Sequence, residues 1–194
     1  MNRIKPNWTL FLDRDGVINC RTNGHFIKVW EDFEWEKGAL EAIVGASAIF
    51  ERIVVVTNQS GLEKRILPEE TLQEIHQNII NTVAEAGGKI DKIYYCPHKA
   101  FSKCTCRKPK TGMAFQAKED FSDIDFTQSV MVGDSISDME FGKALGMYVV
   151  LVAGKKEEYD AQLNVCVDFR AKNLFNFIEN VEKSVLLSKQ NNTL

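Results

Sequence analysis

Five short apolar runs, each of strand length, constrain the fold of this chain more than any other feature. They are rich in Val, Ile, Tyr and Phe, and they occupy residues 9–12, 52–57, 92–96, 129–133 and 148–152. Continuous rather than alternating apolarity is typical of strands buried on both faces of a parallel sheet. Helical patterns lie between and after these runs, at residues 38–51, 68–87, 137–145 and 171–187. The alternation predicts an α/β fold with a doubly wound, mainly parallel sheet.

Composition narrows the class of protein. The chain has 194 residues, 44% of them hydrophobic, and a formal net charge of −3, so we expect one domain over residues 1–194 with a polar tail at about 188–194. A nucleic-acid or membrane-surface partner usually requires a basic excess, and neither is expected here. The first residues, MNRIKPNW, lack the apolar stretch of a signal peptide. We therefore expect a cytoplasmic monomer.

Polar side chains follow three of the predicted strands. The segments are FLDRDG, VVTNQSG and MVGDSISD, and ligands bind beyond the carboxyl ends of strands in open α/β sheets. We expect the side chains after these strands to converge on one crevice: Asp13, Asp15, Thr57, Asn58, Asp134 and Asp138. Carboxylates one residue apart, as at 13 and 15, repel each other and indicate a bound cation.

This inventory of side chains suits Mg²⁺ and a phosphate. Asp13, Asp134 and a backbone carbonyl near Asp15 can supply the oxygen ligands that Mg²⁺ prefers. The Thr57 hydroxyl and the amides around Asn58 can donate to phosphoryl oxygens. A transferring phosphoryl group also requires a positive charge, for which Lys108 in CRKPK is the candidate.

The segments DRDGV, TNQSG and GDSISD, with Lys108, resemble the four motifs of the haloacid dehalogenase (HAD) superfamily of phosphatases, over about residues 8 to 153. The resemblance implies a HAD-like, Rossmann-type fold in which Asp13 attacks phosphorus and Asp15 acts as general acid and base. It implies catalytic Mg²⁺ held by Asp13, Asp15 and Asp134. It also implies a set of residues that bind phosphate or substrate: Thr57, Asn58, Gln59, Ser60, Arg107 and Lys108.

Three of the five cysteines lie within residues 96–106, in the pattern C-x-H-x5-C-x-C. Cys96, His98, Cys104 and Cys106 form a Cys₃His set that suits a closed, tetrahedral, structural Zn²⁺. The alternative is a group of reduced thiols without a metal. The stretch YYCPH…CxCRKP resembles the zinc-containing branch of HAD phosphatases, in which zinc shapes the loop that delivers the arginine and lysine.

That branch includes D-glycero-D-manno-heptose 1,7-bisphosphate phosphatase and histidinol-phosphate phosphatase. The segment TNQSG favours the heptose enzyme, whereas the short gap between His98 and Cys104 favours the histidinol-phosphate type. We expect the heptose bisphosphate, with Arg107 holding its second phosphate. A polynucleotide 3′-phosphatase and a zinc-dependent binding module remain as alternatives. Residues 21–35 are too few for a large cap domain and are expected to form a flap, with His25 either near the substrate or on the surface.

Overall fold

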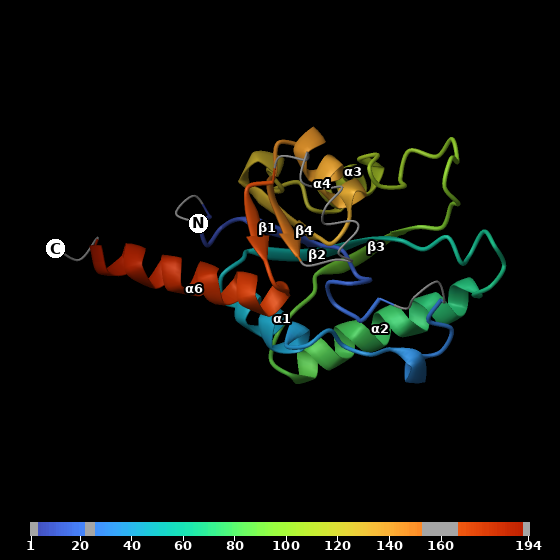
Figure 1. Ribbon diagram of the computed structural model, residues 1–194, viewed down its shortest axis with the longest axis horizontal. Coiled ribbons are helices and arrows are strands. Elements are labelled where there is room, and N and C mark those ends of the chain that lie inside the picture. Colours follow the sequence, from blue (N-terminus) through green and yellow to red (C-terminus); the bar gives the residue numbers. More distant parts are fainter. Residues whose placement is uncertain (1–3, 22–25, 153–166, 192–194) are drawn as a thin grey trace.

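The computed structural model describes residues 4–21, 26–152 and 167–191, and it contains a six-stranded parallel sheet (Figure 1). The strand order is β3-β2-β1-β4-β5-β6, so the first strand of the chain lies inside the sheet, between β2 and β4. The strands are β1 (Thr9–Leu12), β2 (Arg52–Asn58), β3 (Lys92–Cys96), β4 (Ser129–Gly133), β5 (Tyr148–Val152) and β6 (Phe169–Ala171). The prediction of a doubly wound parallel sheet is confirmed, and β6 adds a strand that the sequence did not predict.

Helices cover both faces of this sheet. Figure 1 shows α1 (Ala39–Ser47), α2 (Glu69–Glu85) and α6 (Leu174–Asn191) on one face, with α3 (Gly112–Asp120) and α4 (Ile136–Ala144) on the other. Short 3₁₀ turns occur at η1 (Trp30–Asp32) and η2 (Phe126–Gln128). No helix among the described residues is both long and apolar enough to cross a membrane.

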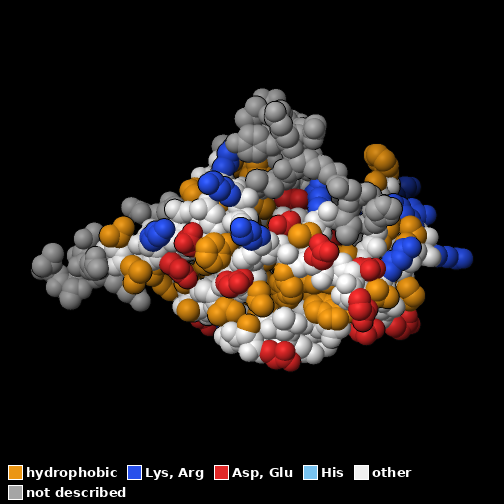
Figure 2. All heavy atoms as spheres, turned by 60° about the horizontal axis from the view of Figure 1, so that its bottom comes forward, with side chains coloured by type: hydrophobic (Ala, Val, Ile, Leu, Met, Phe, Trp, Pro, Cys, Tyr) orange, Lys and Arg blue, Asp and Glu red, His pale blue; other side chains and the backbone are white. Residues whose placement is uncertain are grey.

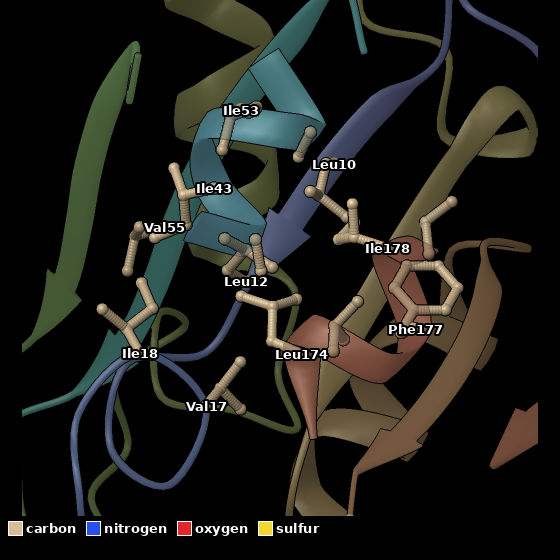
Figure 3. Packing of buried hydrophobic residues seen from close by; sticks show 14 of the residues in the cluster. Leu10, Leu12, Val17, Ile18, Ile43, Ile53, Val55, Leu174, Phe177 and Ile178 are labelled. Carbon is tan, nitrogen blue, oxygen red and sulfur yellow. The ribbon is translucent and has the colours of Figure 1, made fainter. Parts of the chain in front are cut away.

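The two faces of β1 separate two hydrophobic clusters. Leu10 and Leu12 pack with residues of α1, α2 and α6, and Figure 3 shows Leu10 near Ile178 of α6. Phe11 points to the opposite cluster, where Met113 of α3 lies. Because successive strand side chains point to opposite faces, both faces of a fully buried strand must be apolar. This burial explains the continuous apolar runs in the sequence.

The segment between β1 and α1 is short and forms no large cap within its described part. It contains η1, whose Trp30 ring stacks on Phe33 with centroids 4.8 Å apart. A bridge between Asn19 and Trp35 ties the segment to the loop after β1. His25 lies outside the described residues.

Candidate active site

Asp13 follows β1 and continues the sheet, because its backbone N–H donates to the Val132 carbonyl at 2.9 Å. The chain then turns through Gly16, which has a φ of +89°. A Cβ atom built at this glycine would lie 2.0 Å from Asp134 Oδ2. Only glycine therefore allows the loop after β1 to approach the carboxylate that follows β4.

Lys108 is buried at the centre of the site. Its Nζ lies 2.7 Å from Asp13 Oδ1 and 2.6 Å from Asp138 Oδ1, and it donates to the Val56 carbonyl at 2.6 Å. Burial alone would lower the pKa of Lys108, but the charges of Asp13 and Asp138 raise it above its usual value. The lysine is therefore a permanent positive charge beside the first carboxylate.

Asp13 and Asp15 are in different electrostatic environments, although one residue separates them. Burial raises the pKa of Asp13 to about 6, against the opposing effect of Lys108. Burial would also raise the pKa of Asp15, but the Arg14 charge and hydrogen bonds from Arg14, Asn19 and Gln59 hold it below its usual value. The two carboxylates are thus held by separate sets of partners, and before substrate binds Asp15 is the more readily ionised of the two.

The phosphate-binding candidates after β2 occupy distinct positions. Gln59 is buried, and its Nε2 donates to Asp15 Oδ2 and to Thr57 Oγ1, each at 2.8 Å. The Asn58 side chain instead holds the peptide of Lys108, because its Oδ1 accepts from Lys108 N at 3.1 Å. Ser60 is half-buried and does not line the cavity described next.

A cavity of about 220 Å³ opens over these side chains. Its lining residues come from five segments of the chain: Asp13, Asp15, Arg21, Thr57, Asn58, Arg107, Lys108, Ser135, Ser137 and Asp138. A larger hollow of about 530 Å³ runs along β3, but it contains none of the acidic residues that follow β1 and β4. We place the chemistry in the smaller cavity because the charged groups converge there.

Three buried carboxylates could hold a cation. One oxygen from each of Asp13, Asp134 and Asp138 lies within 4.8 Å of the others. The set of hard oxygen donors fits Mg²⁺. Asp15, which was expected to contribute to the Mg²⁺ site through a backbone carbonyl, uses its carboxylate to bind Arg14, Asn19 and Gln59. The Asp15 backbone remains close to the cluster through the turn at Gly16.

The structure brings together the four residues of the Cys₃His set. Cys96 Sγ lies 3.8 Å from Cys104 Sγ, 3.1 Å from Cys106 Sγ and 3.5 Å from His98 Nδ1. Ligands of a tetrahedral zinc, at about 2.0–2.3 Å from the metal, are separated by roughly 3.5–3.8 Å. Burial raises the pKa of Cys96 to about 12, so this residue is a neutral thiol at neutral pH unless a cation is bound. The donor set therefore fits a metal ion, and of the three distances only that between Cys96 and Cys106 is shorter than in a tetrahedral zinc site.

This cluster closes the loop that carries Arg107 and Lys108. Cys96 ends β3, and Cys106 directly precedes the two basic residues. Arg107 Nη1 also donates to the His98 carbonyl at 2.9 Å. The loop thus fixes both cations relative to the sheet.

Sequence reasoning missed several residues of the site. Arg21 lines the cavity and lies 2.7 Å from Asp134 Oδ1, but no motif marks it. Ser135 and Ser137 follow β4. Ser135 forms a capping box with Asp138 at the start of α4, in which Asp138 Oδ2 accepts from the Ser135 backbone N–H at 3.1 Å, and the Ser135 hydroxyl also donates to Asp138 Oδ2 at 2.6 Å. The sequence S-x-x-D before this helix was a signal that could have identified Ser135.

Comparisons with known proteins agree with this geometry. Residues 105–174 match the family model described as HAD-hydrolase-like. The chain is 40% identical to D-glycero-beta-D-manno-heptose-1,7-bisphosphate 7-phosphatase of Pseudomonas putida, over 77% of this chain and 84% of that protein. It is 39% identical to the D-glycero-alpha-D-manno-heptose-1,7-bisphosphate 7-phosphatase of Mycobacterium tuberculosis, over 71% of this chain and 73% of that protein. The chain belongs to the HAD-like phosphatases.

A solved structure of a HAD-like phosphatase has the same architecture. The D,D-heptose 1,7-bisphosphate phosphatase of B. bronchiseptica, complexed with magnesium and phosphate, is 31% identical to this chain. It aligns with a TM-score of 0.82 over 91% of this chain and 98% of its own. Magnesium and phosphate in that relative match the ligands that the carboxylates and Lys108 of this HAD-like phosphatase suit chemically.

Proposed function

We propose that this HAD-like phosphatase removes a phosphate from a D-glycero-D-manno-heptose 1,7-bisphosphate through an aspartyl-phosphate intermediate. The observation that carries the proposal is the convergence of Asp13, Asp15 and Lys108 on one cavity. The relatives that match over most of the chain are named as phosphatases that release the 7-phosphate. We assign the same regiochemistry to this chain.

In the first step, an Asp13 oxygen forms a bond to phosphorus while the bond from phosphorus to the leaving oxygen breaks. Asp15 is ionised in the free site; the negative charge of the bound phosphate raises its pKa, so that it takes a proton from solvent and donates that proton to the leaving oxygen. Lys108, 2.7 Å from Asp13 Oδ1, offsets the negative charge that gathers around the nucleophile. The products of this step are the free alcohol and phosphorylated Asp13.

In the second step, water attacks phosphorus while Asp15 accepts its proton, and the bond from phosphorus to Asp13 breaks. Inorganic phosphate leaves, and Asp15 is protonated for the next cycle. Mg²⁺, when held by Asp13, Asp134 and the backbone near Asp15, screens the repulsion between carboxylate and phosphate. Zn²⁺ held by Cys96, His98, Cys104 and Cys106 would be structural, and such thiolate ligands suit the reducing cytoplasm.

Arg107 is the candidate for the second phosphate. It lines the cavity, and its planar guanidinium has five N–H donors, one of which is used by the His98 carbonyl. A bisphosphate offers an anion to the remaining donors, whereas the far end of histidinol phosphate carries an ammonium and an imidazole. This difference in charge favours the heptose bisphosphate.

The test compares kcat/KM for both anomers of the heptose bisphosphate, histidinol phosphate and a 3′-phosphorylated oligonucleotide. We expect the heptose bisphosphate to be the best substrate, and Arg107→Ala to raise its KM about tenfold or more. Lys103→Ala is the matched control, because Lys103 is an exposed cation of the same loop that does not line the cavity. More efficient turnover of histidinol phosphate, or an Arg107→Ala variant with unchanged KM, would refute the assignment of the substrate.

The charge on one face of the molecule agrees with a small substrate. Figure 2 shows one face of the molecule, on which acidic and basic side chains are interspersed with hydrophobic ones. A surface that binds nucleic acid presents a basic stripe instead. The oligonucleotide in the assay is therefore expected to be the poorest substrate.

A further inference from the structure

Arg14 lies between the two acids of the motif and is one of the most buried charged residues, with 2% of its surface exposed. Its Nη2 and Nε approach Asp15 Oδ1 at 2.7 and 3.3 Å. On its other side, Nη1 lies 3.4 Å from Nε2 of His76, a buried residue of α2. A chain of three side chains thus runs from α2 to the carboxylate that lines the cavity.

The direction of these hydrogen bonds follows from the chemistry of arginine. A guanidinium only donates, so His76 Nε2 must accept, which requires a neutral imidazole with its proton on Nδ1. Burial, together with the positive charge of Arg14, lowers the pKa of His76 to about 3. His76 therefore remains a neutral acceptor at physiological pH.

His76 is itself held in place. Its ring packs against that of Tyr95 on β3, with centroids 5.7 Å apart. The Tyr95 hydroxyl donates to Glu69 Oε1 at the start of α2. The imidazole therefore presents its acceptor to Arg14 from a fixed position between α2 and β3.

Arg14 in turn restricts the orientation of Asp15. Asp15 Oδ1 accepts from Arg14 and from Asn19 Nδ2 at 3.0 Å, while Oδ2 accepts from Gln59 Nε2 at 2.8 Å. The Arg14 carbonyl also accepts the N–H groups of Val17, Ile18 and Asn19, which fixes the backbone of the same turn. Loss of the His76 acceptor would leave a buried N–H of Arg14 without its partner, and the guanidinium would have to move to find another.

We propose that His76 is a positioning residue for the reaction: by anchoring Arg14, it holds the Asp15 carboxyl group in the orientation that transfers a proton to the leaving group. The inference rests on the proposed function, because it takes Asp15 as the general acid. If His76 only filled space in the core, replacing it would lower the activity on all substrates equally, whether or not their leaving group needs a proton.

The experiment measures how strongly catalysis depends on the leaving group. An alkyl phosphate requires a proton on its leaving oxygen, whereas p-nitrophenolate leaves readily without one. We expect His76→Met to lower kcat/KM about tenfold or more on the best primary-alkyl phosphate, and less than about threefold on p-nitrophenyl phosphate. His76→Gln, nearly the same size as the Met variant but with an acceptor oxygen, should restore most of the loss.

Three further variants make the outcomes distinguishable. The ratio to compare is the loss of kcat/KM on the alkyl phosphate divided by the loss on p-nitrophenyl phosphate. Asp15→Asn should give a larger ratio than His76→Met. If Asp15→Asn lowers both activities equally, the role of Asp15 is wrong, and this inference is wrong with it. If Asp15→Asn changes the ratio while His76→Met lowers both activities equally, His76 is structural and only this inference fails. Arg14→Lys, which keeps the charge and loses the planar fork, provides the same comparison if the Met variant does not fold.

Ile79→Val, at a buried position of α2, is the control for a small loss of stability, and it should leave the ratio unchanged.

Discussion

At the scale of single residues, the active site separates two chemically identical carboxylates by their neighbours. Asp13 is paired with a buried ammonium and Asp15 with a buried guanidinium. The lysine is shared with Asp138 and a backbone carbonyl, whereas the guanidinium is shared with a histidine. The carboxylates that we propose as nucleophile and proton donor are therefore controlled by different parts of the fold.

Asp13→Asn should abolish turnover while the fold is retained. The amide keeps the size of the side chain but is not a nucleophile, so the barrier should rise by about 5 kcal/mol or more. Lys108 retains Asp138 and the Val56 carbonyl as partners, so the variant should still fold. Phosphate release and a circular dichroism spectrum test the two halves of this prediction, and a variant with a tenth of the wild-type rate would exclude Asp13 as the nucleophile.

Asp134→Ala should weaken Mg²⁺ binding. Asp134 is buried within the cluster of three carboxylates, and one of the few oxygens available to the cation is lost with it. Calorimetric titration of Mg²⁺ should show at least about tenfold weaker binding, and activity should require correspondingly more Mg²⁺. Full activity of protein dialysed against EDTA, with no Mg²⁺ added, would contradict the assignment.

His76 should make stability depend on pH. Its pKa in the folded protein is lowered to about 3, whereas an unfolded chain has the usual value of 6.5. Below pH 6.5 the unfolded chain binds a proton that the folded protein does not, so stability falls as the pH falls. Between pH 7 and 5.5, the free energy of unfolding of the wild type should drop about 1 kcal/mol more than that of His76→Gln. Urea titrations at the two pH values measure this difference, and equal losses would show that His76 is protonated in the folded state.

At the scale of elements, the loop that contains His98, Cys104 and Cys106 connects the end of β3 to Lys108. Cys104→Ser should reduce the zinc content from about one ion per chain and destabilise this loop. Cys20→Ser is the matched control, because Cys20 is a free cysteine outside the cluster. Elemental analysis of protein purified without chelators is the measurement, and wild-type protein without zinc would refute the metal assignment.

The elements also show how far the sequence alone could predict this fold. Runs such as TLFL, KIYYC and SVMVG predicted β1, β3 and β4 with their observed bounds, because buried parallel strands must be apolar on both faces. Strand β6 has three residues, of which only Ala171 is buried, and so leaves no apolar run. Helix α3 was missed because its buried positions are mostly alanine, which gives a weak periodicity.

The residues of the site also divide into those that the sequence could predict and those that it could not. Strand ends indicated Asp13, Thr57 and Asp134, because parallel strands deliver their next residues to one edge. The pairing of Arg14 with His76 could not be predicted, because it depends on where α2 lies against the turn after β1. Contacts between elements that are distant in the sequence can be predicted only once the packing of those elements is known.

At the scale of the whole molecule, stability and chemistry are located in different places. Phe177 of α6 is fully buried, lies beside Ile178 (Figure 3) and against the ring of Phe169, and does not line the cavity. Phe177→Ala should lower the free energy of unfolding by about 3–5 kcal/mol and the Tm by roughly 10 °C. Leu186→Ala, on an exposed part of the same helix, should change stability by less than about 0.5 kcal/mol. Calorimetry tests both, and kcat at 20 °C should be unchanged, so a loss of activity in folded Phe177→Ala would show that the core and the site are linked.

The central place of β1 in the sheet has a consequence for how the protein is made. Strand β1 leaves the ribosome before both of its neighbours in the sheet, which are residues 52–58 and 129–133. At synthesis rates of about 5–20 residues per second, one edge of this apolar strand stays unpaired for several seconds. During that interval we expect chaperones to bind the nascent chain. If translation stalls before β4, the fragment has an unpaired strand edge that is prone to aggregate.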